Sequence, residues 1–130
     1  MPFQNWFELP VVLPPHLVSW VANNEMHIGG RVTDVPEPHL TLLYGFEPIR
    51  YSDVARDVAS FKIDTTALTF GEPRKGTEAN VWLVDVTGPT LQECFWFLHG
   101  KYENQHTLFN GHFEPHVTLC WFEPDEAAAV

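Results

Sequence analysis

The sequence contains few cysteines and no long apolar run. Cys94 and Cys120 are the only cysteines among its 130 residues, and they lack the spacing of a zinc site. This excludes a disulfide scaffold, so we expect two reduced thiols in the core. No stretch reaches about 18 consecutive apolar residues, the length that a transmembrane helix needs, so we expect no membrane partner.

Basic residues are also scarce. Seven Lys and Arg stand against 17 Asp and Glu, which gives a formal net charge of −10. A field of this sign repels phosphate backbones and disfavours long duplex nucleic acid as a partner, although local donors can still bind a small anion. Residues 1–20 carry no Lys or Arg and are interrupted by prolines, unlike a secretory signal, so we expect a cytoplasmic protein.

What remains is the composition of an ordinary globular domain, with 45% hydrophobic and 18% charged residues. Helical spacing and end signals, with Ser52 as an N-cap and Gly100 as a C-terminal stop, predict helices over residues 14–26, 53–61 and 89–100. Runs of strand-forming residues predict strands over residues 39–46, 62–73, 81–86 and 116–122, with a loop over 71–80. The interleaving predicts a two-layer α+β domain with antiparallel or mixed sheet.

One internal repeat stands out. The segment 37–42, Glu-Pro-His-Leu-Thr-Leu, recurs as Glu-Pro-His-Val-Thr-Leu at 114–119, which is an offset of 77 positions. A spacing this large in a short chain indicates two half-domains, roughly 1–66 and 67–124, followed by an acidic tail over 125–130. Each half presents one copy of the segment, so we expect a pseudo-twofold arrangement within a single domain.

The repeat places the same residue types on one face of two strands. Side chains alternate along a strand, so His39 shares a face with Thr41, and His116 shares a face with Thr118. Two opposed imidazoles suit phosphoryl transfer, because one accepts a proton from the nucleophile while the other donates a proton to the leaving oxygen. The threonine hydroxyls can donate to phosphoryl oxygens.

The duplicated His-x-Thr, with an apolar residue following each copy, resembles the two-histidine (2H) phosphoesterase superfamily over most of the chain. The resemblance implies a bilobal α+β fold in which antiparallel or mixed sheets line a central cleft with helices outside. It implies catalysis without cofactor or metal on a phosphodiester beside a ribose 2′-hydroxyl. Branches of the family include RNA 2′,3′-cyclic phosphodiesterases, hydrolases of 2′-5′ oligonucleotides, and phage proteins that destroy cyclic-oligonucleotide immune signals.

The acidity of the chain favours a small nucleotide or cyclic oligonucleotide over a long RNA as substrate. The only adjacent basic pair lies in the predicted loop over 71–80 and could meet a phosphate, while strand aromatics could stack on a base. The candidate substrate-binding residues are therefore Tyr44, Arg74, Lys75, Trp82 and Trp121, with Phe122 as a further aromatic beside them. The alternative without a binding role is that the basic pair forms a solvated hairpin tip and that the aromatic side chains belong to the hydrophobic core.

Several rival interpretations remain open at this point. A metal site could recruit His106, His112, Glu114 and His116, but their spacing matches no zinc pattern. The repeated segment could be structural, with proline setting the entry into each strand. The fold could sequester a nucleotide without cleaving it, process RNA ends that carry 2′,3′-cyclic phosphates, or serve as a protein adaptor through exposed aromatics.

Overall fold

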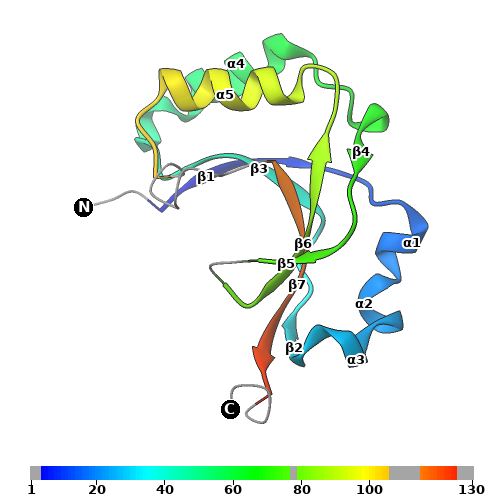
Figure 1. Cartoon of the computed structure of the whole chain (residues 1–130). Coiled ribbons are helices and arrows are strands. Elements are labelled where there is room, and N and C mark those ends of the chain that lie inside the picture. Colours follow the sequence, from blue (N-terminus) through cyan, green and yellow to red (C-terminus); the bar gives the residue numbers. More distant parts are fainter. Residues whose placement is uncertain (1–3, 77–78, 106–114, 126–130) are drawn as a thin grey trace.

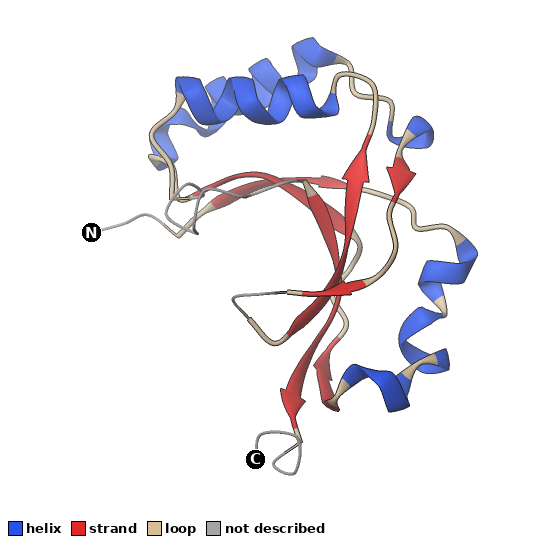
Figure 2. Ribbon diagram, viewed as in Figure 1, coloured by secondary structure: helices blue, strands red, loops and turns tan. Residues whose placement is uncertain are grey.

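The computed structural model describes residues 4–76, 79–105 and 115–125 as a mixed α+β structure with antiparallel sheets and two main helices. Helices α4 (Tyr51–Phe61) and α5 (Leu91–Lys101) lie side by side above strands β1 (Trp6–Pro10) and β3 (His39–Tyr44), as Figures 1 and 2 show. The predicted α+β class is thus confirmed at this level. None of the described helices is long and apolar enough to cross a membrane.

The remaining elements are short, apart from the two long strands of the second half. The helical segments are α1 (Pro15–Val18), α2 (Trp20–Asn23) and α3 (Glu25–Ile28), with 3-10 turns at Pro48–Arg50 and Thr65–Ala67. The strands are β2 (Gly30–Asp34), β4 (Thr69–Phe70), β5 (Arg74–Lys75), β6 (Val81–Thr87) and β7 (His116–Pro124). One sheet pairs β1 with β3, and the other has the order β2-β7-β6-β4, with β5 also paired to β6.

Most predicted elements are confirmed, and the errors lie at helix ends and in short segments. The helix predicted over 14–26 is three single turns instead, and of the strand predicted over 62–73 only β4 forms. Ser52 lies inside α4 and is not its N-cap, because the preceding 3-10 turn leads directly into a helix that begins at Tyr51. Gly100 likewise lies inside α5, whose C-cap is Tyr102. The predicted loop over 71–80 contains β5.

The main hydrophobic core draws on both strand pairs. Leu40, Leu42 and Leu43 of β3 are fully buried, and they belong to the same cluster as Val84 of β6 and Val117 of β7. Helix α5 covers β3, although the two elements are about 50 residues apart in sequence. Cys94 and Cys120 are buried, unpaired thiols, as predicted, and burial raises the pKa of Cys94 to about 11.

Three polar contacts join the halves across this core. The Tyr102 hydroxyl donates to the Asp57 carboxylate at 2.5 Å, and the Lys101 ammonium reaches the same oxygen at 2.8 Å, which ties α5 to α4. His99 of α5 lies with its Nε2 3.2 Å from the carbonyl oxygen of Leu42 in β3. Burial lowers the pKa of His99 to about 4, so this imidazole is neutral at pH 7 and its Nε2–H donates to the carbonyl.

Candidate active site

The strands that carry the repeated segment are held by the same backbone frame in both halves. In the first half, the amide of Val11 donates to the Pro38 carbonyl at 3.2 Å, and the amide of Gly45 donates to the Asn5 carbonyl at 2.7 Å. In the second half, the bonds run from Val86 to Pro115 and from Phe122 to Asn80, each at 3.0 Å. Between the two halves, the residues that form these bonds differ by 77 positions in the repeat strand and by 75 positions in its partner strand. The backbone pairing therefore repeats as well as the sequence.

A β-bulge occurs at the same place in each frame. The pairing of β1 with β3 shifts between Phe7 and Glu8, and that of β6 with β7 shifts between Trp82 and Leu83. In both cases the extra residue lies in the repeat strand. These two residues, Leu42 and Leu119, are also 77 positions apart. A bulge resets the alternation of side chains beyond it.

The histidines and threonines lie on the less buried face of each strand. His39 and Thr41 are half-buried while Leu40 is fully buried, and His116, Thr118 and Val117 repeat this pattern. Strands β3 and β7 lie against each other without forming a hydrogen-bonded ladder. The two repeated segments therefore meet where their sheets adjoin. We call the face that carries the histidines and threonines the site face.

His39 is oriented by its own chain. Its Nδ1 lies 2.7 Å from the carbonyl oxygen of Glu37 and 3.7 Å from the Glu8 carboxylate. A carbonyl can only accept a hydrogen bond, so Nδ1 carries the proton. In the neutral ring Nε2 is then the nitrogen that can accept a proton from a substrate. The imidazole is thus held in the tautomer that a general base needs.

His116 faces a carboxylate on the neighbouring strand. Asp85 of β6 is its cross-strand partner, and because Val86 bonds to Pro115, Asp85 and His116 form a non-hydrogen-bonded pair. Side chains approach most closely in such pairs. The guanidinium of Arg74 binds Asp85 through Nε at 2.8 Å and Nη2 at 2.9 Å. This ion pair holds the pKa of Asp85 below its usual value, and the electrostatic interaction with His116 adds to the effect.

The structure divides the predicted substrate-binding residues into two groups. Arg74 pairs with Leu83 and Trp121 pairs with Val81, which places both on the site face with Thr118, and the bulge places Tyr44 there too. Lys75 and Trp82 lie on the opposite face.

The residues on that opposite face have other roles. The Lys75 ammonium lies 5.3 Å from the centre of the Phe122 ring, which is itself buried. Trp82 packs against Trp20 with ring centres 5.1 Å apart, and its Nε1 donates to the Ile28 carbonyl at 3.0 Å. We therefore leave Lys75, Trp82 and Phe122 out of the proposed site.

Three residues of the site face were missed in the sequence. Glu8 lies opposite Thr41, Asp85 lies opposite His116, and Trp6 lies opposite Tyr44. The Trp6 indole is 50% exposed and donates to Glu8 at 2.9 Å. For Asp85 the available signal was a charged residue inside a predicted strand, since its side chain must face away from the core. Only the pairing register shows which residue of the motif each one meets.

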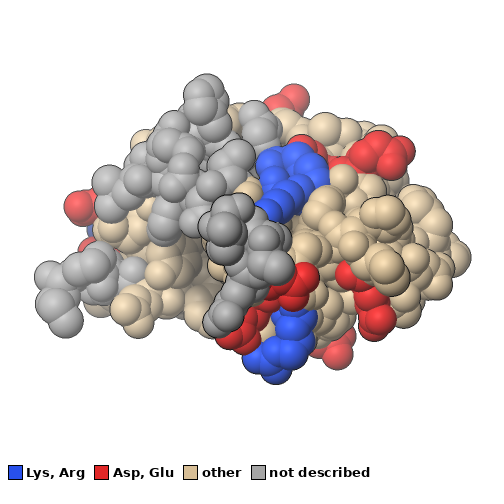
Figure 3. Space-filling model, turned by 60° about the horizontal axis from the view of Figure 1, so that its bottom comes forward, with Lys and Arg blue, Asp and Glu red and all other residues tan. Residues whose placement is uncertain are grey.

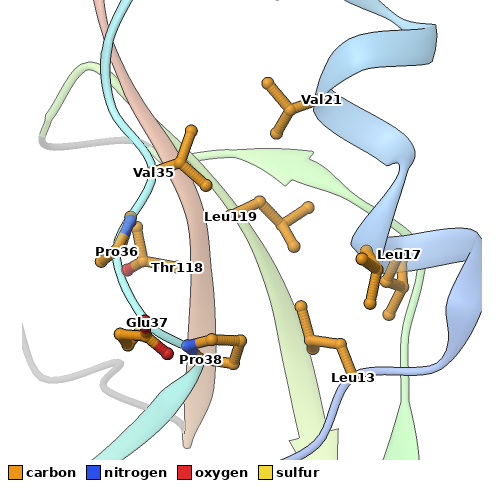
Figure 4. Close-up of a pocket in the computed structure, with 10 residues that line it drawn as sticks. Leu13, Leu17, Val21, Val35, Pro36, Glu37, Pro38, Thr118 and Leu119 are labelled. Carbon is orange, nitrogen blue, oxygen red and sulfur yellow. The ribbon is translucent and has the colours of Figure 1, made fainter.

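A mostly apolar pocket of about 250 Å³ adjoins the site. Figure 4 shows Leu119 pointing from β7 toward Leu17, with the segment 35–38 along the other wall. Thr118 and the residues just before His39 thus border one hollow. The segment contains Pro36 and Pro38, which have no amide hydrogen to extend the ladder of β2 along β7.

Charge on the visible surface is divided into small groups. Figure 3 shows Lys and Arg in separate patches, each bordered by Asp or Glu, and this face carries no continuous basic stripe among the described residues. Within the described part of the chain, no three His, Cys, Asp or Glu side chains gather as a metal site would require. His106, His112 and Glu114, named above as possible ligands, lie outside the described residues.

No model of a known protein family matches this chain, and no curated protein is similar to it in sequence.

Proposed function

We propose that this chain is a two-histidine phosphoesterase whose two halves are related by a pseudo-twofold axis, with the site between them. The observation that carries the proposal is the repeated frame around His39 and His116. The flanking hydrogen bonds, the bulge and the burial pattern all recur at the same positions of the repeat. A purely structural role for the segment does not require that the two copies lie side by side with both histidines on the less buried face.

The reaction proposed for this site is cleavage of a phosphodiester next to a ribose 2′-hydroxyl in a small or cyclic nucleotide. One neutral imidazole takes the proton of the attacking 2′-hydroxyl, or of water, as the new phosphorus–oxygen bond forms. The other, as imidazolium, gives its proton to the leaving oxygen as the old bond breaks. Attack by the 2′-hydroxyl leaves a 2′,3′-cyclic phosphate and a free hydroxyl, and no step draws on a cofactor.

The threonines and the Asp85–Arg74 pair complete the site. The hydroxyls of Thr41 and Thr118 donate to the phosphoryl oxygens, whose charge increases in the transition state. Asp85 stabilises the imidazolium form of His116 and holds its ring in place. Arg74 keeps Asp85 ionised and is the cation of the described site face nearest to the motif. These short-range donors let an acidic protein bind an anion.

The proposal is tested by a chromatographic screen for cleavage in EDTA. The substrates are 2′,3′-cyclic mononucleotides, 2′-5′ oligoadenylate, and cyclic di- and trinucleotides. We expect wild type to cleave at least one of them, and His39→Ala or His116→Ala to lose about 10²- to 10⁴-fold in rate. His27→Ala is the matched control, because His27 is exposed on α3. Full activity in both motif variants, with circular dichroism unchanged, would refute the assignment, and binding without turnover would favour the sequestering alternative.

A further inference from the structure

We propose that the substrate carries a base on each side of the phosphate that is cleaved. The inference rests on the proposed function and deepens it. It begins from an aromatic residue found at the same position of both repeats. Tyr44 follows His39 by five residues, and Trp121 follows His116 by five residues.

The bulges decide where these two rings lie. In a regular strand, a residue five positions after the histidine points to the opposite face, which here is the core. The extra residue in each repeat strand restores the site face, so that Tyr44 pairs with Trp6 and Trp121 pairs with Val81. The two residues at each bulge are buried in the core instead of the aromatic ring. They are Leu42 and Leu43 in β3, and Leu119 and Cys120 in β7.

The spacing fits a nucleotide. Neighbours on one face of a strand are about 7 Å apart, so a phosphate held between a histidine and a threonine leaves the next side chain about one nucleotide away. Tyr44 is half-buried and Trp121 is 42% exposed. Neither residue is therefore fully buried.

The two rings lie in different directions from the histidines. In Figure 1, β7 begins beside β3 and then runs away from it, past β5 toward the C-terminus. Trp121, near the far end of β7, is therefore carried away from β3 and Tyr44. A ligand that uses both rings must extend to both sides of the phosphate.

A dinucleoside phosphate or a cyclic dinucleotide meets this requirement, whereas a 2′,3′-cyclic mononucleotide has one base and can use only one ring. One base–aromatic stack is worth about 5- to 150-fold in binding. We therefore expect kcat/KM for a two-base substrate to exceed that for the cyclic mononucleotide by at least about 5-fold.

The experiment compares adenylyl-adenosine, with 2′-5′ or 3′-5′ linkage, and cyclic diadenylate against 2′,3′-cyclic AMP. Tyr44→Ala and Trp121→Ala are each expected to lose about 5- to 150-fold in kcat/KM on the preferred two-base substrate, mainly through KM. Only one of them should affect 2′,3′-cyclic AMP. Tyr44→Phe and Trp121→Phe should restore the KM, and Trp96→Ala is the control because Trp96 is an exposed tryptophan of α5.

Two different failures are distinguishable. Equal kcat/KM on one-base and two-base substrates, in an enzyme that still needs His39, would overturn the inference and leave the proposed function standing. Loss of the proposed function would appear as no turnover of any substrate by wild type. In that case binding decides: a 2′-deoxy adenine dinucleotide that binds no more tightly than deoxyadenosine monophosphate would overturn the inference, and tighter binding lost in both alanine variants would support it.

Discussion

The two strand pairs, β1 with β3 and β6 with β7, have the same backbone hydrogen bonds and bulge around the motif, but they differ in the side chains opposite it. His39 lies opposite Pro10 and Thr41 lies opposite Glu8, whereas the equivalent positions in the second half carry Asp85 and Leu83. Each half thus has one carboxylate opposite its motif histidine or threonine, and these two carboxylates lie two residues apart in the frame. In the proposed reaction, the repeated backbone determines where the phosphate lies. The unequal carboxylates distinguish the two histidines, so we expect them to divide the acid and base roles between them.

The largest expected effect tests the part that the halves share. Thr41→Val and Thr118→Val remove a hydroxyl at nearly constant volume, and we expect each to lower kcat by about 10²- to 10³-fold, because each removes a donor to the transition-state oxygens. Steady-state kinetics on the preferred substrate measures the loss. A change in one variant but not in the other would break the functional equivalence of the halves.

The next effect is smaller and tests the part that differs. Asp85→Asn removes an anion opposite His116, which weakens proton binding there, so one limb of the bell-shaped pH–rate profile should move to lower pH. The loss of kcat/KM should be about 10-fold, below that of removing the imidazole itself. The limb that moves in Asp85→Asn identifies the role of His116. A profile in which neither limb moves would contradict the proposed interaction of Asp85 with His116.

A third prediction concerns stability at the joint between the halves. Tyr102→Phe removes a hydrogen bond to the partly buried Asp57 carboxylate, and we expect the free energy of unfolding to fall by about 1 kcal/mol. Urea denaturation measures it. Lys101→Ala should cost less, because the Lys101 side chain is about half exposed and its ion pair is screened. Neither change should alter kcat, since both lie away from the site face.

The last effect depends on pH and concerns His99, which lies next to the bulge of the first half. Its folded pKa of about 4 lies below the usual value near 6.5, so between these values the unfolded chain binds a proton that the folded protein does not. Stability should therefore fall as the pH is lowered from about 6.5 to 4, with a slope below about 1.4 kcal/mol per pH unit for one partly screened group. His99→Gln keeps a donor for Leu42 and should flatten this slope, whereas His16→Gln, at an exposed position, should not.

The sequence predicted the motif strands because the repeat is explicit there. Alternation of polar and apolar residues around His39 and His116 was enough to assign the buried and the open face, and both assignments are confirmed by burial. Long helices with a clear apolar stripe, such as α4, were found for the same reason. Helix ends were less predictable, because the 3-10 turn before α4 overrides the capping preference of Ser52.

The sequence alone did not predict which side chains lie on the site face where this depends on the pairing register of the strands. Arg74 and Lys75 were predicted together, yet neighbours in a strand face opposite ways, and only Arg74 shares the face of Asp85. The offset of Trp121 from its histidine, read without the bulge, would have placed the ring in the core. A bulge is defined by how a strand pairs with its partner, and the local sequence pattern does not specify that pairing.

The shared core has a consequence for how this protein folds. Helix α5 of the second half packs on β3 of the first, and one apolar cluster contains residues of both halves. Because this cluster spans both halves, we expect the amide hydrogens of β3 and β7 to exchange through one global opening. The two motif strands should therefore be formed and lost together.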